Sequence, residues 1–206
     1  MFCISLKPSH LNLIKNIGYI PVGLGEKDFS NEWLGDKTEN NISLKNNFYG
    51  EYTFHYWLWK NNKVELKGWV GFCQYRKFWK KDSSNIKEHN FSEFNNTILK
   101  EIPENLSKYD VVLGEDYFIN QFRFSKFIKH NFRVMALQPS LFFNKKKRTL
   151  KFHFDMMHGH GNLNKAIQVL NKKDKEDFND FVNSETSFNP HNMFICRDKK
   201  ILFSYY

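Results

Sequence analysis

Cysteine is scarce in this sequence, where Cys3, Cys73 and Cys196 are an odd number without Cys-x-x-Cys spacing. Disulfide frameworks need paired cysteines, and structural zinc sites need clustered cysteine or histidine ligands. The pattern therefore argues against both. We expect each cysteine to be a small core residue on a strand.

Long apolar runs are also missing. The longest, such as "GWVGFC" and "MALQPSLFF", fall well short of the roughly 20 residues that cross a bilayer. The N-terminus lacks the basic region and long apolar stretch of a signal peptide. We therefore expect a cytoplasmic protein, and the length of 206 residues predicts a single domain over residues 1–206.

Positive charge is in excess, with 31 Lys and Arg against 22 Asp and Glu and a net charge of +9. It is concentrated in "YRKFWKK" (75–81), "NKKKR" (144–148) and "NKK" (171–173). Such clusters attract phosphates, so nucleic acid, anionic lipid and a nucleotide-linked substrate are candidate partners. The alternative is that these lysines only form a solvated surface.

Strands and helices alternate along the predicted chain. The patterns indicate strands at 2–6, 19–25, 67–75, 109–116 and 191–197. They indicate helices at 51–62, 91–102, 121–131, 149–159, 162–171 and 174–183, with Asn162 and Asp174 as caps of the last two. This order predicts an α/β fold with a mostly parallel sheet and a helical C-terminal portion.

The helix predicted at 51–62 carries aromatic residues on every side. Tyr52, Tyr56 and Trp59 share one face, while Phe54 and Trp57 cover another. A helix that is apolar all round is normally a buried one. We therefore expect a fully buried helix, preceded by a loop over residues 26–47 that is rich in asparagine.

In open α/β sheets the ligand binds outside the carboxyl ends of the strands. This rule makes Gly23–Gly25, Gln74–Lys77, Glu115 and Asp116 candidate site positions. The asparagine-rich loop would close over the same edge.

Three segments, "YIPVGLG", "NISLKNNFYGEYTFHYWLWKN" and "GWVGFCQYRKFW", resemble the N-terminal signature of a bacterial domain family from capsule and O-antigen polysaccharide loci. "NPHNMFIC" (189–196) is similar to a late strand of the same family. The matching positions are Asp36, Asn41, Ile42, Ser43, Lys45, Asn46, Glu51, Thr53, Tyr56, Trp57, Trp59, Lys60, Asn61, Tyr75 and Arg76. The chain departs at Gln74, where the family usually has His, and at Lys77, where it usually has Arg.

This resemblance implies a GT-A-like, Rossmann-like glycosyltransferase, a group that includes galactofuranosyltransferases. The expected partners are a nucleotide sugar, UDP-linked in the simplest case, and a saccharide or lipid-linked acceptor. We expect peripheral contact with the inner face of the plasma membrane through "KKKR", and no nucleic acid partner. Relatives continue beyond "ILFSYY", so we expect a C-terminal helical segment of the family to be lacking here.

Several residues become candidates for substrate binding. Arg76, which ends a predicted buried strand next to Tyr75, could form two hydrogen bonds with a phosphate, or an ion pair with Glu51. Glu51 could bind substrate, or sit at a helix start because the helix dipole favours it there. Asn41 and Ser43, like Gly23 and Asn46 at the same edge, could contact a sugar or base, or serve only the local turns.

For chemistry, we predict Asp155 as general base with His158 orienting it or the acceptor, because positions three apart on a helix share a face. The alternatives are half of a metal site or a polar helix end. Many GT-A enzymes bind Mg²⁺ or Mn²⁺ through an Asp-x-Asp motif, which is absent here. Glu115 and Asp116 are the weaker candidates for the base or for a metal site.

Two other classes of function compete with glycosyl transfer. A single-strand nucleic-acid-binding module would use the basic clusters with aromatic stacking. An inactive member of the family would act as a scaffold, a reading that Gln74 encourages. The aromatic residues sit mostly at core spacings, which favours the transferase over the nucleic-acid module.

Overall fold

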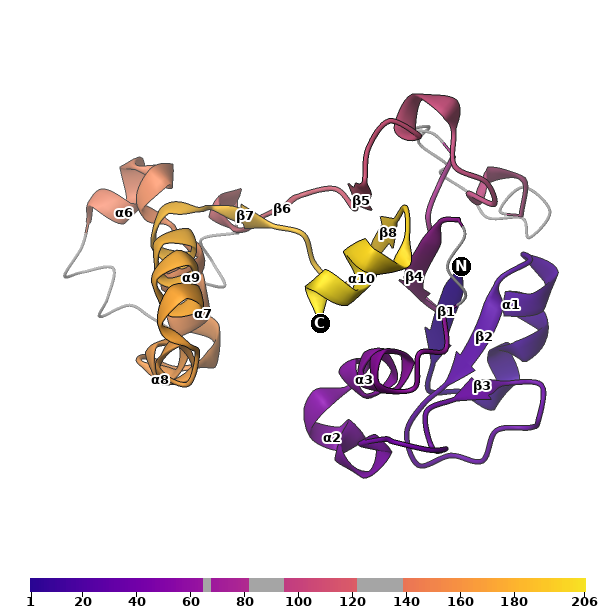
Figure 1. Ribbon diagram of the computed structural model, residues 1–206. Coiled ribbons are helices and arrows are strands. Elements are labelled where there is room, and N and C mark those ends of the chain that lie inside the picture. Colours follow the sequence, from indigo (N-terminus) through magenta and orange to yellow (C-terminus); the bar gives the residue numbers. More distant parts are fainter. Residues whose placement is uncertain (65–67, 82–94, 122–138) are drawn as a thin grey trace. The chain divides into compact units, whose positions relative to one another are not determined.

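The computed structural model describes residues 1–64, 68–81, 95–121 and 139–206 (Figure 1). Its contacts divide the chain into two compact units. Unit 1 comprises Met1–Gly114 and His191–Tyr206, and unit 2 comprises Glu115–Pro190. Unit 1 has two buried apolar clusters and unit 2 has one of its own, so we describe the units separately.

Unit 1 is built on a six-stranded sheet in the order β3-β2-β1-β4-β8-β5. The strands are β1 (Phe2–Ser5), β2 (Ile20–Gly23), β3 (Leu34–Gly35), β4 (Val70–Gln74), β5 (Val111–Leu113) and β8 (Phe194–Cys196). β1, β2, β3 and β4 are parallel, and β8 runs antiparallel to both of its neighbours. The predicted α/β fold with a mostly parallel sheet is confirmed, as are the strands predicted at 2–6, 19–25, 67–75, 109–116 and 191–197.

Side chains alternate between the two faces of this sheet, as the period of a strand requires. On β1, Phe2 and Ile4 pack into the core cluster that contains Phe72, whereas Cys3 packs into the opposite cluster beside Cys73. Both faces are thus covered, which explains why these strands read as continuous apolar runs. Cys196 is buried as well and all three cysteines are free, so their predicted role as core residues is confirmed.

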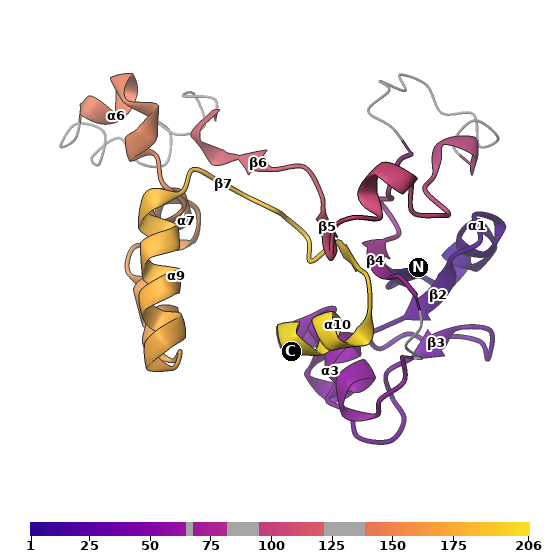
Figure 2. The ribbon, with the colours of Figure 1, turned by 45° about the horizontal axis from the view of Figure 1, so that its top comes forward.

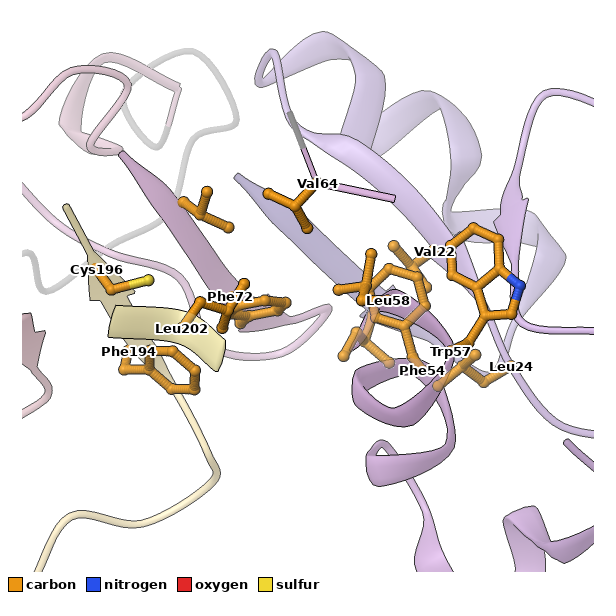
Figure 3. Packing of buried hydrophobic residues seen from close by; sticks show 12 residues of the cluster. Val22, Leu24, Phe54, Trp57, Leu58, Val64, Phe72, Phe194, Cys196 and Leu202 are labelled. Atoms are coloured by element: carbon orange, nitrogen blue, oxygen red, sulfur yellow. The ribbon is translucent and has the colours of Figure 1, made fainter. Parts of the chain in front are cut away.

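The helices of unit 1 lie on both faces of the sheet. They include α1 (Leu11–Asn16), α2 (Asn46–Tyr49), α3 (Tyr52–Lys60) and α10 (Lys199–Tyr205), with the short 3₁₀ helices η1 (Pro8–His10), η2 (Ser43–Lys45) and η3 (Glu104–Leu106). α3 and α10 are neighbours in both views (Figure 1 and Figure 2). They cover one face through Phe54, Leu58 and Leu202, as Figure 3 shows, while Ile14 of α1 packs on the other.

The prediction that the helix at 51–62 is buried all round was wrong. Phe54 and Leu58 are fully buried and Trp57 nearly so, but Tyr52 is 45% exposed. Tyr56 and Trp59 are half-buried. The helix is therefore amphipathic, with an aromatic outer face.

Residues 26–47 were expected to be a loop, but they contain β3, η2 and the start of α2. A two-residue strand and single turns of helix are too short to produce a periodic pattern. The helix predicted at 91–102 begins outside the described residues. Its described part is helical only over 95–97, and Ile98 then pairs with Lys80 in an isolated bridge.

Unit 2 is mainly helical. Its elements are β6 (Tyr117–Phe118), η4 (Ile119–Gln121), α6 (Ser140–Phe143), η5 (Lys145–Lys147), α7 (Leu150–His158), α8 (Asn162–Gln168), α9 (Lys172–Ser184) and β7 (Ser187–Phe188). β6 and β7 form an antiparallel pair. Leu163, Ile167 and Val182 form the small core between α8 and α9.

The last two predicted helices of unit 2 exist, but their predicted caps were wrong. α8 is capped by Gly161 in a left-handed conformation (φ +80°), and the Asn162 side chain instead donates to the carbonyl of His158 at 2.8 Å. α9 begins at Lys172, two residues before the predicted start, because the Asn171 side chain accepts a hydrogen bond from the Asp174 backbone N–H. Apart from Gln121, which ends η4, the helix predicted at 121–131 lies outside the described residues. Within the described ranges, none of the helices is long and apolar enough to cross a membrane.

Candidate functional site

The carboxyl ends of four parallel strands meet at one edge of the unit 1 sheet. β1 ends at Ser5, β2 at Gly23, β3 at Gly35 and β4 at Gln74. β8 is antiparallel to β4, so the residues just before Phe194 reach the same edge. The sequence predicted this edge as the site, and the structure places Glu51, Tyr75 and the asparagine-rich loop there.

Glu51 is the centre of a network of amides at this edge. Its Oε2 accepts a hydrogen bond from Gln74 Nε2 at 2.6 Å, and its Oε1 accepts one from Asn192 Nδ2 at 2.9 Å. Asn192 Oδ1 in turn accepts from the Tyr52 hydroxyl at 2.9 Å. An ion pair between Glu51 and Arg76 was one of the two expectations for Arg76. Among the described contacts, Glu51 is instead paired with the side-chain amides of Gln74 and Asn192. Gln74 thus supplies a hydrogen-bond donor to Glu51.

Tyr75 stacks on His10 of η1, which is held in turn by Ser5 of β1. Its ring lies on that of His10, with centroids 4.4 Å apart, and His10 Nδ1 is 2.9 Å from Ser5 Oγ. The Arg76 guanidinium lies 4.9 Å from the Tyr75 ring centroid. Arg76 itself is exposed at the strand end. Its charge is therefore oriented by an aromatic surface and remains available to a ligand.

The asparagine-rich loop is organised by its own side chains. Asn41 Oδ1 accepts from the Ser43 backbone N–H at 3.2 Å and from its hydroxyl at 2.8 Å. Asn46 Nδ2 donates to the Gly50 carbonyl and to Thr53 Oγ1. These bonds are the turn-forming role that the sequence left as the alternative. They shape a hollow of about 450 Å³ lined by Gly25, Glu26, Lys37, Asn41, Ser43, Leu44, Asn46 and Asn47.

Gly23 has a packing role. A side chain there would collide with the ring of Phe29.

Asp36, which follows β3, is 1% exposed, and its burial raises the pKa of its carboxyl, an effect that Thr53 partly offsets. Asp36 belongs to the matching pattern but had no assigned role, and the structure places it beside Thr53 in the first turn of α3.

Two residues of this edge were missed by sequence reasoning. His191 and Asn192 precede β8 and have φ values of +77° and +47°, which non-glycine residues rarely adopt. Such backbone conformations cluster at functional sites. The segment "NPHNMFIC" marked the region, but no sequence pattern shows that these residues turn back toward Glu51.

The predicted catalytic residues lie in unit 2. Asp155 Oδ2 pairs with Lys151 Nζ at 3.1 Å, and its Oδ1 accepts from the Gly161 N–H at 3.3 Å. The imidazole that approaches Asp155 is that of His160, at 3.9 Å, and not that of His158 as expected. His158 instead packs on the ring of Phe154 one turn earlier, with centroids 4.6 Å apart.

Glu115 and Asp116 also belong to unit 2 and are exposed. Asp116 Oδ1 accepts a hydrogen bond from Asn189 Nδ2 at 2.9 Å. This bond joins the beginning and the end of unit 2, Glu115–Pro190. Among the residues that the structure describes, no three His, Cys, Asp or Glu side chains are grouped as ligands of a metal ion.

The mostly parallel sheet, in which β8 is antiparallel to both of its neighbours, defines an α/β protein with a polar edge at the carboxyl ends of its parallel strands. One solved structure with this fold is described as the apo structure of WbbM, a bifunctional glycosyltransferase, and aligns with a TM-score of 0.51 at 18% identity. The alignment covers 99% of this chain and 34% of that one, so the chain spans about a third of its length. At this identity the likeness establishes the fold.

The family follows from a match over almost the whole chain. Residues 2–206 match the model described as "Domain of unknown function (DUF4422)". The chain therefore belongs to the DUF4422 family. No curated protein matches it significantly.

Proposed function

We propose that this protein transfers a hexosyl group, with galactofuranosyl as one candidate, from a UDP-linked or similar nucleotide sugar to a saccharide or lipid-linked acceptor in surface polysaccharide synthesis. The observation that carries the proposal is the set of side chains at the carboxyl edge of four parallel strands. Arg76, oriented by Tyr75, follows the strand whose last residue, Gln74, donates to Glu51. The asparagine-rich loop reaches the same edge next to Gly25, which follows β2. The fold shared with a glycosyltransferase supports the same reaction class.

The proposed chemistry is a displacement at the anomeric carbon. The acceptor oxygen forms a bond to this carbon, and the bond to the diphosphate oxygen breaks with its electron pair staying on the diphosphate. A base removes the acceptor proton, and positive charge stabilises the leaving group. We assign the base to Asp155, with His158 as a residue that orients the acceptor and with Glu115 or Asp116 as the alternative base or metal site.

Donor binding should depend on Arg76. Hydrogen bonds to charged groups contribute about 1.5–3 kcal/mol, so Arg76→Ala should weaken binding of a UDP-sugar by roughly tenfold to a hundredfold. The measurement is a calorimetric or NMR titration with the variant's folding checked by circular dichroism. Unchanged affinity would show that the donor binds elsewhere.

Arg197→Ala is the matched control for Arg76→Ala. Arg197 is an arginine of the same unit, but it follows β8, whose register with Val70 places it at the opposite edge of the sheet. It pairs with Asp110 at 3.2 Å and donates to the Ser107 carbonyl. We expect its removal to leave UDP-sugar affinity as in the wild type.

Membrane contact should depend on the lysines of η5. Lys145, Lys146 and Lys147 are all exposed, and a basic residue near an anionic bilayer contributes about 1 kcal/mol. Replacing these three with Glu should release the protein from vesicles that contain phosphatidylglycerol in a sedimentation assay. The control is a variant with the same change in net charge, in which Lys172, Lys173 and Lys175 are all replaced with Glu. Equal loss of binding in both would mean that net charge, and not the η5 surface, is responsible.

A further inference from the structure

Beside the Glu51 network lies a second group of side chains that the sequence analysis did not connect. The chain turns sharply after β4, where the Lys77 backbone N–H donates to the Gln74 carbonyl at 2.9 Å. This turn folds Lys77 back along the end of the strand. There its Nζ contacts Nε2 of His191.

The backbone that presents His191 is strained and firmly held. Residues 191 and 192 both have positive φ, a conformation that persists only where the surroundings fix it. Asn192 provides that fixation through its bonds to Glu51 and to the Tyr52 hydroxyl. The imidazole is thus placed at the strand end by the same network that holds Glu51.

The charges at this corner are unbalanced. Among the described contacts, Arg76 and Lys77 have no carboxylate partner, and the nearby carboxylate of Glu51 already accepts two hydrogen bonds from amides. Lys77 instead meets a ring nitrogen of His191, which must be unprotonated to accept from an ammonium. The corner therefore offers two cations and one proton acceptor to an incoming anion.

We propose that Lys77 and His191, together with Arg76, bind the diphosphate of the donor and stabilise it as it leaves. The proposal rests on the proposed function for the identity of the ligand. As the bond to the anomeric carbon breaks, the diphosphate gains one negative charge, and preorganised cations stabilise that charge more than the ground state. The side chains then supply what a bound divalent ion supplies in other enzymes.

Binding at this corner has a signature in pH. The charged groups that face His191 are Lys77 and Glu51, and burial together with Lys77 lowers the pKa of His191, with Glu51 opposing. An anion that draws the Lys77 ammonium away raises the pKa of His191, so a proton is taken up on binding. Affinity conferred by His191 should therefore increase as the pH falls.

The test is a calorimetric titration with inorganic pyrophosphate and with UDP in EDTA. We expect Lys77→Ala to weaken binding of both ligands about tenfold or more. The control is Lys108→Ala, which should have no effect because Lys108 lies before β5, at the opposite edge of the sheet. His191→Asn suits the left-handed backbone. The ratio of wild-type affinity to that of His191→Asn should rise as the pH falls from 8 to 6, a comparison in which the ligand's own titration cancels.

Three results would overturn the inference: equal affinity in Lys77→Ala and wild type, a ratio that does not change with pH, or wild-type binding that appears only after Mg²⁺ is added. They are distinct from failure of the proposed function. UDP-sugar binding that depends on Arg76 but not on Lys77 would leave the transferase proposal standing. Pyrophosphate binding through Lys77 without any binding of a sugar nucleotide would keep the anion site and remove the transferase.

Discussion

Asp155→Asn should lower the rate of sugar transfer by roughly 10²- to 10⁴-fold while leaving donor affinity unchanged, because a positioned base acts on the acceptor proton and not on the donor. The asparagine is isosteric, so its Oδ1 can still accept the hydrogen bond from Gly161. The fold of the α7–α8 corner should therefore survive. Initial rates of nucleoside diphosphate release with acceptor present, beside a donor titration, measure the two effects separately.

Asp116→Asn is the control for this prediction. Asp116 is a carboxylate of the same unit whose described contact is a hydrogen bond from Asn189, and we expect the variant to keep both donor binding and transfer. The opposite pattern would move catalysis to the Glu115–Asp116 segment, where EDTA sensitivity would separate a base from a metal ligand. Wild-type rates in both variants would place the base on another residue.

Phe72→Ala should lower the free energy of unfolding by about 3–5 kcal/mol, because it removes a large side chain from a core that cannot close around the gap. Phe72 is 1% exposed on β4, and its ring contacts those of Phe2, His55 and Phe194. It stands two residues before Gln74, so the same change should loosen the end of the strand. Urea unfolding followed by fluorescence measures the effect.

Phe48→Ala provides the comparison for the core substitution. Phe48 is 88% exposed on α2, and surface substitutions usually change the free energy of unfolding by less than about 0.5 kcal/mol. A loss of similar size in the two variants would contradict the assignment of Phe72 to the main core.

Most strands of unit 1, namely β1, β2, β4 and β8, could be predicted because burial on both faces makes them apolar almost throughout. β1 and β4 carry their cysteines in register, Cys3 beside Cys73, and the sequence shows both as short apolar runs. β3 could not be predicted in the same way. It has two residues, and it exists because Val22 and Gly23 of β2 pair with it.

The position of the candidate site could be predicted from the strand ends, but its contacts could not. Tyr75 and Arg76 follow a recognisable strand, so their place at the edge was evident. The partners of Glu51 were not, because Asn192 is 141 residues away in sequence and reaches it through a left-handed turn. Likewise, Asp155 and His158 share a helix face by spacing alone, yet Phe154 and Gly161 draw their side chains apart.

The most direct measurement of the central claim is ligand-detected NMR of the wild-type protein with a panel of nucleoside-diphosphate sugars. We expect saturation transfer to at least one sugar nucleotide, its displacement by the matching nucleoside diphosphate, and its loss in Arg76→Ala but not in Arg197→Ala. The account would be contradicted if no sugar nucleotide bound while a single-stranded oligonucleotide bound in a salt-sensitive manner.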